Sequence, residues 1–351
     1  MSGRARGWTW WIALTGRAGA AGTRALVFLL GAAGLAAVGL GMWVLLTPTP
    51  IMRSGPRTIE IPLHQGVAGV ARQLQDEGIV RSRLAFILLA AVTGKARSLK
   101  AGEYLVPRDE SALGVLALLA SGRVVQHHVV LPEGHSLAEL ARLLEAERLA
   151  TVPEVLRAAH DPAFLLSQGI AAESVEGYLF PDTYQLVRGM KPEEILARMV
   201  GRMRERMSPI LAEIRAREIT VHAALTLASI IEREAVDPSE MPLISAVFWN
   251  RMRRDMPLQA DPTVQYAVGR ERQRLTREDL QADSPYNTYR RPGLPPGPIG
   301  NPGLAAIRAA ISPAPVGYLY FVAADDRRHH FSTTLEEHNA AVARYRSNRP
   351  R

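Results

Sequence analysis

The sequence predicts an α+β protein with a single N-terminal transmembrane helix, a small β-α-α-β domain and a larger mixed α+β domain. Three observations lead to this fold class: a long uncharged apolar run near the N-terminus, short strand and helix patterns in residues 58–127, and a longer mixture of both in residues 128–345. The chain has 351 residues, of which 47% are hydrophobic and 22% are charged, so it can bury the cores of two domains.

The transmembrane prediction rests on residues 26–47, which contain no charged side chain. A helix of this length reaches about 30 Å, the thickness of the hydrocarbon core of a bilayer. Residues 1–25 carry four arginines and no acidic residue, which indicates a cytoplasmic N-terminus. We therefore expect a single-pass protein of the cell inner membrane whose larger domain is periplasmic. A cleaved signal peptide is the alternative, but the apolar run is long for one and no clear A-x-A site follows it.

The small domain is predicted to follow a linker. Residues 48–57 hold three prolines and one glycine and are interpreted as that linker. Alternating side chains predict a strand over Thr58–Pro62. The apolar run Leu84–Val92 is too short to span a bilayer, and we expect it to form a helix in the domain core. The other predicted elements are a helix over 67–74, a strand over 103–106 and a helix over 112–120.

The larger domain shows a helix start and a helical core stretch. Ser136 and Glu139 form an S-x-x-E capping box before an apolar run, which predicts the first turn of a helix. The stretch from Pro192 to about Ile214 carries methionines at helical spacing, a pattern typical of a packed core rather than of a ligand site. The remaining predicted features are a strand over 124–131, paired strands over 318–322 and 329–332, and a tail over 346–351.

Composition argues against several classes of function. The chain has no cysteine, so disulfides, thiolate metal sites and a cysteine nucleophile are excluded. The formal net charge is +8, but no Lys/Arg-rich block is interleaved with aromatic residues, and we expect no nucleic-acid partner. The serine-hydrolase, phosphate-loop and zinc-protease motifs are missing, and adjacent histidine pairs point to opposite faces of a strand. We therefore expect no metal ion and no cofactor.

Two carboxylates stand out at the end of one apolar helix. Val221–Glu234 reads VHAALTLASIIERE, which predicts a helix that is buried nearly all round. Glu232 and Glu234 each share a helix face with apolar residues four and seven positions earlier. An apolar environment raises the pKa of a carboxyl, as a general acid at neutral pH requires. Two solvated charges paired with Arg233 or Arg251 are the alternative, and the local sequence does not choose between them.

Three further stretches have a composition that is unusual for segments with a purely structural role. They are EGYLFPDTY at 176–184, LQADPTVQY at 258–266 and YNTYRRPGLPPGPIGNPG at 286–303. Loops that are stiffened by proline and carry Tyr, Asn and Asp suit a carbohydrate cleft, where rings stack on sugars and amides bind hydroxyls. A rigid structural loop is the alternative for each.

Together these motifs resemble the YceG-like family of MltG-type endolytic murein (peptidoglycan) transglycosylases. The similarity runs from about Thr58 to Tyr345 and includes, in order, GVARQLQDEGIV, LKAGEY, LPEG, EGYLFPDTY, LASIIERE, LQADPTV and SPYNTYRRPGLPPGPIGNPG. The last four motifs are specific in combination. One departure is Ala235, which stands where the family often has a threonine after the second glutamate. The resemblance implies a LysM-like domain over 58–127 and a YceG-like catalytic domain over 128–345.

The resemblance also implies an activity. Such a protein cuts the MurNAc–GlcNAc bond within nascent glycan strands, leaves 1,6-anhydroMurNAc ends and terminates strand elongation. The family's catalytic glutamate falls on Glu232. A single carboxyl can first protonate the glycosidic oxygen and then take the proton from the 6-hydroxyl of muramic acid. The expected partners are peptidoglycan strands, the inner membrane and peptidoglycan synthases.

Several residues are expected to line the saccharide cleft beside Glu232. They are Glu176, Gln259, Asp261, Tyr286, Asn287 and Tyr289. Each has an alternative interpretation as a helix cap or a loop brace. Two other functions stay open: a muramidase-type hydrolase that uses Glu232 with Asp261 as a second carboxylate, and a non-catalytic glycan-binding scaffold.

Overall fold

The structure is a computed structural model that describes residues 9–49, 55–270, 272–325 and 327–348. The chain divides between residues 125 and 126 into two compact units. Parts of three predicted segments lie outside the described residues. They are the first eight residues of the basic N-terminus 1–25, residues 50–54 of the linker 48–57 and the last three residues of the tail 346–351.

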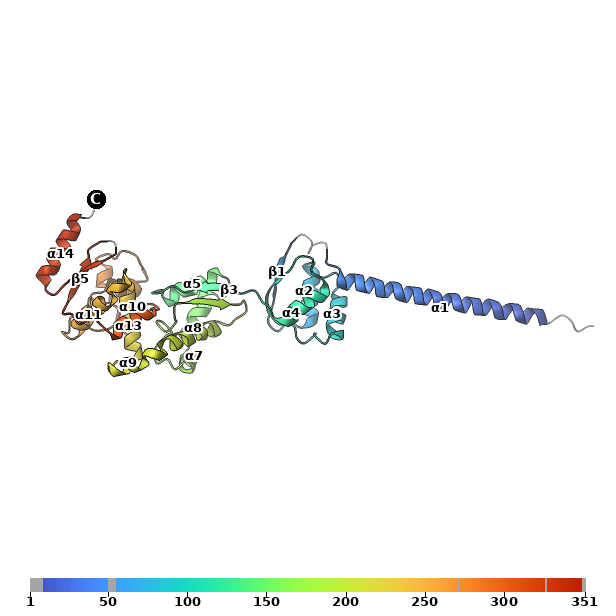
Figure 1. Ribbon diagram of the computed structural model, residues 1–351, viewed down its shortest axis with the longest axis horizontal. Coiled ribbons are helices and arrows are strands. Elements are labelled where there is room, and N and C mark those ends of the chain that lie inside the picture. The colour runs from blue at the N-terminus through green and yellow to red at the C-terminus, as the bar shows by residue number, and fades with distance from the viewer. Residues whose placement is uncertain (1–8, 50–54, 271, 326, 349–351) are drawn as a thin grey trace, which may run out of the picture. The chain divides into compact units, whose positions relative to one another are not determined.

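The first unit begins with one long helix, α1 (Thr9–Leu46), shown in blue in Figure 1. Its segment Arg24–Leu46 is long enough and apolar enough to cross a membrane, in agreement with the run predicted over 26–47. The helix also extends well before that run, because no proline interrupts it and alanine favours helix. Pro48 disfavours helical geometry at the preceding residue, and the helix ends there.

The rest of the first unit is a small module of two strands and three helices. In chain order these are β1 (Arg57–Ile61), α2 (Val67–Asp76), α3 (Arg83–Val92), β2 (Gly102–Val106) and α4 (Ala112–Ser121). The first four have the β-α-α-β order that the sequence predicts. The strands β1 and β2 pair antiparallel with Ile59 opposite Tyr104, and both side chains are buried. The Tyr104 hydroxyl is satisfied because it donates to the Lys100 carbonyl over 2.8 Å.

Helix α3 corrects one expectation, because it does not lie wholly in the core. Phe86 and Ala90 are buried, but Leu84, Leu88 and Val92 are 71%, 64% and 79% exposed. An unbroken apolar run does not reveal which of its faces meets the core. The module is small, so it covers only one side of this helix, and the prediction that the run is buried was wrong for the other side.

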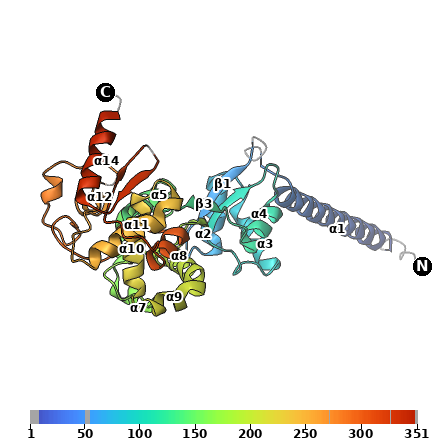
Figure 2. The same cartoon turned by 60° about the vertical axis from the view of Figure 1, so that its left-hand side comes forward.

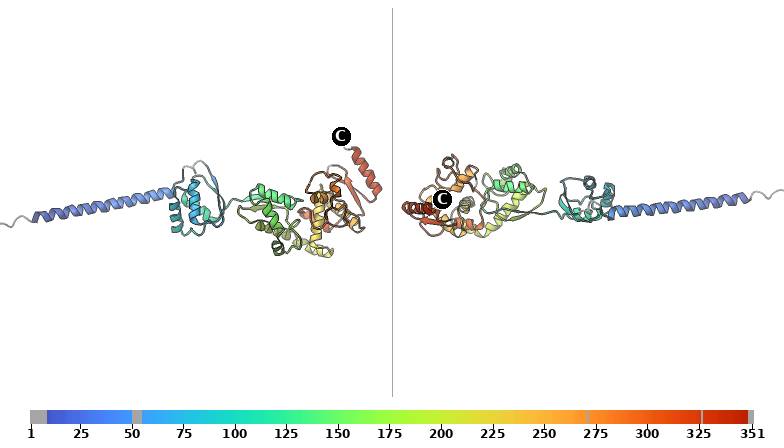
Figure 3. Two further views of the ribbon diagram at one scale, coloured as in Figure 1. Left: turned by 180° about the vertical axis from the view of Figure 1, so that it is seen from behind. Right: turned by 90° about the horizontal axis from the view of Figure 1, so that it is seen from above.

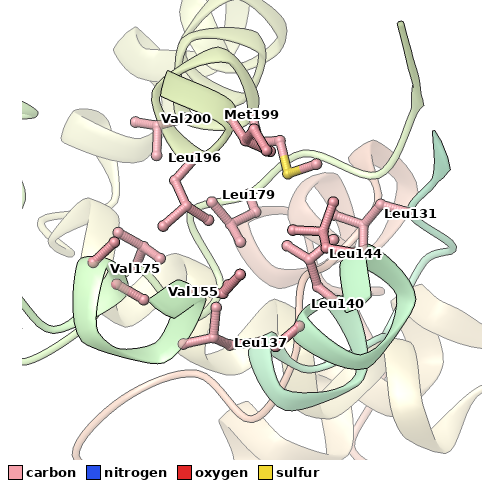
Figure 4. Packing of buried hydrophobic residues seen from close by; sticks show 14 of the residues in the cluster. Leu131, Leu137, Leu140, Leu144, Val155, Val175, Leu179, Leu196, Met199 and Val200 are labelled. Carbon is pink, nitrogen blue, oxygen red and sulfur yellow. The ribbon is translucent and has the colours of Figure 1, made fainter. Parts of the chain in front are cut away.

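The first half of the second unit packs helices around a two-stranded sheet. Its elements are β3 (His127–Val130), α5 (Leu137–Ala146), α6 (Val152–Ala159), α7 (Pro162–Ser167), β4 (Thr183–Leu186) and α8 (Pro192–Met207). The strands β3 and β4 pair antiparallel. The predicted capping box of Ser136 and Glu139 is present at the start of α5. Leu140 and Leu144 of α5 meet Leu196 and Met199 of α8 in the core that Figure 4 shows.

The predicted helical stretch from Pro192 to Ile214 is interrupted. Helix α8 ends at Met207, a short 3-10 turn follows, and α9 (Leu211–Ala216) completes the stretch. Pro209 lies in that turn and cannot donate the hydrogen bond that a continuous helix needs. The methionine side chains Met199, Met203 and Met207 are buried, as their spacing predicted.

The second half of this unit is built around α10. Its elements after α9 are α10 (Val221–Glu234), α11 (Met241–Met252), α12 (Asp261–Ala267), α13 (Leu304–Ile311), β5 (Tyr320–Ala323), β6 (His329–Ser332) and α14 (Leu335–Asn348). Helix α10 packs against α11, α12 and α13 in a second apolar core. The strands β5 and β6 form the predicted antiparallel pair. The green first half and the yellow-to-red second half of this unit lie side by side in both views of Figure 3.

Candidate active site

Helix α10 positions Glu232 and Glu234. Thr220 begins the helix, because its side chain accepts a hydrogen bond from the Ala223 amide. All residues from Ala224 to Ile231 are buried, in agreement with the uniformly apolar sequence. The two carboxylates follow in the last turn, where the helix reaches the surface of the unit.

A loop rich in proline and glycine is fastened to the end of α10. The Ile299 amide donates to Ser229 Oγ over 3.0 Å, and Arg233 donates to the Ile299 carbonyl over 3.0 Å. The Gly303 amide donates to Glu232 Oε2 over 2.9 Å. This part of the chain is therefore an ordered loop, and its last bond fixes the direction of the Glu232 carboxyl.

Asn301 in the same loop is fully buried and joins three segments that are distant in the sequence. The Gly134 amide donates to the Asn301 carbonyl over 2.8 Å, and the Asn301 amide donates to the His135 carbonyl over 2.9 Å. The side-chain oxygen of Asn301 accepts from the amides of Gly177 and Leu179 over 3.0 and 3.1 Å. The LPEG, EGYLFPDTY and GPIGNPG motifs thus meet at one residue.

A polar pocket of about 450 Å³ opens at the end of α10. Its size lies within the range of ligand sites. The lining residues are Glu133, Gly134, Glu232, Arg233, Glu234, Asp261, Pro262, Gln265 and Arg272. Carboxylates and guanidinium groups thus share one open cavity, an arrangement suited to proton transfer and to binding polar groups. Among the described residues, no set of three or more His, Asp and Glu side chains is arranged to hold a metal ion.

Burial makes both α10 carboxyls weaker acids. It raises the pKa of Glu232 from 4.5 to about 7, while the Gly303 amide lowers this pKa and the negative charge of Glu133 raises it. Burial likewise raises the pKa of Glu234 to about 8, and the charge of Asp261 adds to the effect. A carboxyl with a pKa near 7 can give and take a proton at neutral pH, which is the property of a general acid/base.

Asp261 and Tyr289, both predicted cleft residues, are in direct contact. Asp261 is the first residue of α12 and lines the pocket with Glu232. The Tyr289 hydroxyl donates to Asp261 Oδ1 over 2.5 Å. Burial raises the pKa of Tyr289, and this hydrogen bond raises it further, so the hydroxyl keeps its proton and remains a donor. Tyr289 therefore orients Asp261.

Glu176 and Tyr286 lie at a second cavity. This cavity of about 350 Å³ is lined by both residues together with His222. Glu176 is itself buried, and its carboxylate accepts from the Leu137 amide over 3.0 Å at the start of α5. Tyr266 donates to the same carboxylate over 3.3 Å, and its ring centroid lies 5.1 Å from that of Tyr286. Glu176 thus braces the loops, whereas Tyr286 presents an aromatic ring to a cavity.

Asn287 and Gln259 do not line the pocket of Glu232. Asn287 is fully buried and donates to the carbonyls of Leu280 and Ala282 over 3.0 and 2.8 Å, which closes its own loop. Gln259 is exposed and has a left-handed backbone with φ 53°. Its side-chain oxygen accepts from Arg251 over 3.3 Å.

Sequence reasoning missed several residues of the pocket. Glu133, Arg233, Gln265 and Arg272 line it but were not named as binding residues. The useful signal for Glu133 was its place in the LPEG turn directly before the helix capping box. No local pattern marks Arg272, which reaches the site by contacting another segment of the chain.

Gly300 allows two of the motif loops to approach each other. A Cβ at position 300 would lie 2.7 Å from the Gly134 carbonyl oxygen, closer than side chains are found. We expect Gly300→Ala to displace the Gly134 turn from Glu232, to lower the free energy of unfolding by about 1–3 kcal/mol and to slow catalysis. Thermal melting and the rate of substrate cleavage measure the two effects.

Gly201→Ala is the matched control for this substitution. Gly201 lies inside α8, and a Cβ there would meet no atom within 4 Å. This change should leave stability unaltered or raise it by about 0.5–1 kcal/mol, because alanine favours helix over glycine. Equal melting temperatures for the two variants would contradict a close approach at Gly300.

The fold and the site define an α+β protein with a carboxyl of raised pKa at the end of a buried helix, beside an open polar pocket. The chain matches the YceG-like family over residues 59–344 and belongs to it.

The chain is also similar to named relatives and to a solved structure. The chain is 31% identical over 318 residues to the endolytic murein transglycosylase of Bacillus subtilis strain 168, covering 86% of this chain and 88% of the relative. It is 30% identical over 321 residues to the endolytic murein transglycosylase of Streptococcus pneumoniae D39, covering 82% of this chain and 58% of the relative. A crystal structure of a yceG-like protein from Listeria monocytogenes shares 33% identity with a TM-score of 0.59, over 81% of this chain and 98% of that one.

Proposed function

We propose that this protein is a lytic transglycosylase that cuts within peptidoglycan strands, with Glu232 as its acid/base. Its family and the relatives named endolytic murein transglycosylase support the activity. The assignment of Glu232 is carried by one observation: its partly buried carboxyl lines an open pocket and has a pKa raised to about 7. Such a group is protonated often enough to start the reaction and basic enough to complete it.

The proposed reaction needs one carboxyl used twice. Protonated Glu232 gives its proton to the oxygen of the MurNAc–GlcNAc bond, and the bond between this oxygen and C1 of MurNAc breaks. The resulting carboxylate takes the proton of the MurNAc 6-hydroxyl as O6 bonds to C1. The strand then ends in 1,6-anhydroMurNAc, Glu232 is protonated again, and no water is consumed. The Gly303 amide, 2.9 Å from Glu232 Oε2, stabilises the intermediate carboxylate.

The saccharide is proposed to occupy the pocket of Glu232. Asp261, oriented by Tyr289, is the predicted cleft residue with the best access to it. Tyr286 at the second cavity offers a ring on which a sugar can stack. Glu176, Gln259 and Asn287 are proposed to act through the loops that they brace.

The location of the enzyme is a further part of the proposal. Helix α1 is proposed as an uncleaved single-pass anchor of the inner membrane, with a cytoplasmic N-terminus and a periplasmic catalytic domain over 128–345. The β-α-α-β module is proposed to be a LysM-like domain over 58–127. In this position the enzyme acts on nascent strands and ends their elongation, with peptidoglycan synthases as partners.

The product of the reaction tests the proposed activity. The full chain in detergent is incubated with purified peptidoglycan, and the released sugars are weighed by mass spectrometry. We expect products that are lighter by one water than the corresponding reducing sugars, because the ring closes on O6 without hydrolysis.

Other products would indicate a different function. Reducing ends would contradict the transglycosylase mechanism and favour a muramidase in which Asp261 is the second carboxylate. Glycan that is bound but left uncut would favour a scaffold.

A further inference from the structure

The small module carries an exposed apolar ridge that the proposed reaction does not use. Leu84, Leu88 and Val92 of α3 form this ridge, and all three side chains are mostly exposed. They are spaced by four residues, so they lie along one side of the helix. Phe86 and Ala90 hold the other side in the module core. A contiguous row of exposed apolar side chains marks an interaction surface.

Basic residues flank the ridge at both ends of α3. Residues 81–100 contain no acidic residue, and their basic residues are Arg81, Arg83, Lys95, Arg97 and Lys100. The side chains of Arg83, Arg97 and Lys100 are exposed. An apolar helix side with flanking Lys and Arg is the pattern of a helix that lies in the interface of an anionic membrane.

The proposed membrane anchor ends against this same module. Leu45 of α1 packs on the module core, and α1 contacts α3. The Arg81 guanidinium lies 4.2 Å from the centre of the Trp43 ring, and it donates to the Pro48 carbonyl over 2.8 Å. In Figures 1 and 2, α3 lies on the side of the module from which α1 leaves. Because tryptophan near the end of a membrane helix sits at the headgroup level, the ridge is held near that level.

We propose that the α3 ridge binds the outer leaflet of the membrane that α1 crosses. Leu84, Leu88 and Val92 enter the acyl region, and the flanking Arg83 and Arg97 meet anionic headgroups. This inference rests on the proposed membrane anchorage of α1. A lipid surface is the occupant that the contacts favour, because α1 keeps the ridge beside lipid at a high effective concentration. The module is therefore a second membrane contact, distinct from the anchor.

Depth measurements on the full chain test this surface. Because the chain has no cysteine, Leu88→Cys provides a single labelling site for an environment-sensitive fluorophore. The protein is reconstituted in vesicles of phosphatidylethanolamine and phosphatidylglycerol that contain lipids with a quencher on the acyl chain. Leu35→Cys in α1 reports the anchor, and Leu166→Cys, at an 81% exposed position of the second unit, reports water.

We expect quenching at position 88 on the order of twofold stronger than at position 166, and weaker quenching at 88 when phosphatidylcholine replaces the anionic lipid. Quenching at 35 with none at 88 would overturn the lipid contact and leave the anchor intact. Lack of quenching at both positions would overturn the anchor and the ridge contact together. A fluorophore at position 88 that is still shielded from water in detergent, and more so at higher protein concentration, would indicate that the ridge binds a second copy of the chain. That result would contradict this proposal.

Discussion

Replacing Glu232 with glutamine is expected to slow strand cleavage about 100-fold to 10,000-fold and to leave the fold intact. The glutamine amide has nearly the shape of the carboxyl, and its oxygen can still accept the hydrogen bond from the Gly303 amide, which is 2.9 Å long in the wild type. It has no proton to give to the glycosidic oxygen and cannot take one from the 6-hydroxyl. The initial rate of 1,6-anhydro product formation measures the loss, and circular dichroism checks the fold.

Glu193→Gln is the matched control, because Glu193 is an exposed glutamate in the first turn of α8, away from the pocket. It should cleave strands at the normal rate. If Glu232→Gln is folded and turns over substrate like this control, the acid/base belongs to another residue, and Glu234 is the next carboxyl to change.

The raised pKa of Glu232 also sets a pH dependence. The first step needs the protonated carboxyl, so the wild-type rate per bound substrate should fall as pH rises through about 7. Residual activity of Glu232→Gln should lack this titration. A wild-type rate that stays constant from pH 6 to pH 8 would contradict Glu232 as the acid, since about one pH unit on each side of a pKa changes protonation strongly.

The raised pKa of Glu232 also makes the stability of the fold depend on pH. The direction of this dependence is opposite to that caused by an ion-paired carboxyl, whose pKa is lowered on folding. The folded protein holds the Glu232 proton more tightly than the unfolded chain does, because the folded pKa of about 7 exceeds the ordinary 4.5. Stability from this group is therefore highest below pH 4.5 and falls as pH rises from 4.5 to about 7. Glutamine carries no such penalty, so Glu232→Gln should be more stable than wild type at pH 8, by about 1–3 kcal/mol.

The parts of this site that could be predicted from the sequence are those marked by a local sequence pattern. Helix α10 was predictable with its ends, because its burial makes nearly every position apolar. The raised pKa values of its two carboxyls could be expected for the same reason. The exposed ridge on α3 could not be predicted, because the nine-residue apolar run Leu84–Val92 has the same sequence pattern whether one side or both sides of the helix are covered.

Contacts between distant segments were not predictable in the same way. Tyr289 and Asp261 were both expected near the saccharide, yet nothing in the sequence says that one donates a hydrogen bond to the other. Glu133 precedes Glu232 by about a hundred residues, and only the fold brings it to the same pocket. Asn301 carried no functional signal of its own, since a buried asparagine and a solvated one have the same local sequence.

Asn301→Ala is expected to lower the free energy of unfolding by about 3–5 kcal/mol and to reduce activity in the protein that remains folded. The substitution leaves the buried amides of Gly177 and Leu179 without their acceptor. It also removes the side-chain donor that reaches the His135 carbonyl over 2.9 Å. A buried polar group that loses its hydrogen-bond partner destabilises the fold by its full desolvation free energy. Because several groups lose a partner at this one place, we expect a larger loss of stability than from truncating a single core side chain.

The effect on activity separates this residue from a merely stabilising one. Asn250→Ala is the control, because Asn250 is a buried asparagine on α11 whose side chain donates to the Val316 and Tyr318 carbonyls over 2.9 and 2.8 Å, outside the pocket. Both variants should melt at lower temperatures. Well below these temperatures, where both are folded, only Asn301→Ala should show a reduced kcat, because its loops carry Gly134 and Gly303 beside Glu232. Normal kcat in folded Asn301→Ala would mean that Glu232 is positioned by α10 alone.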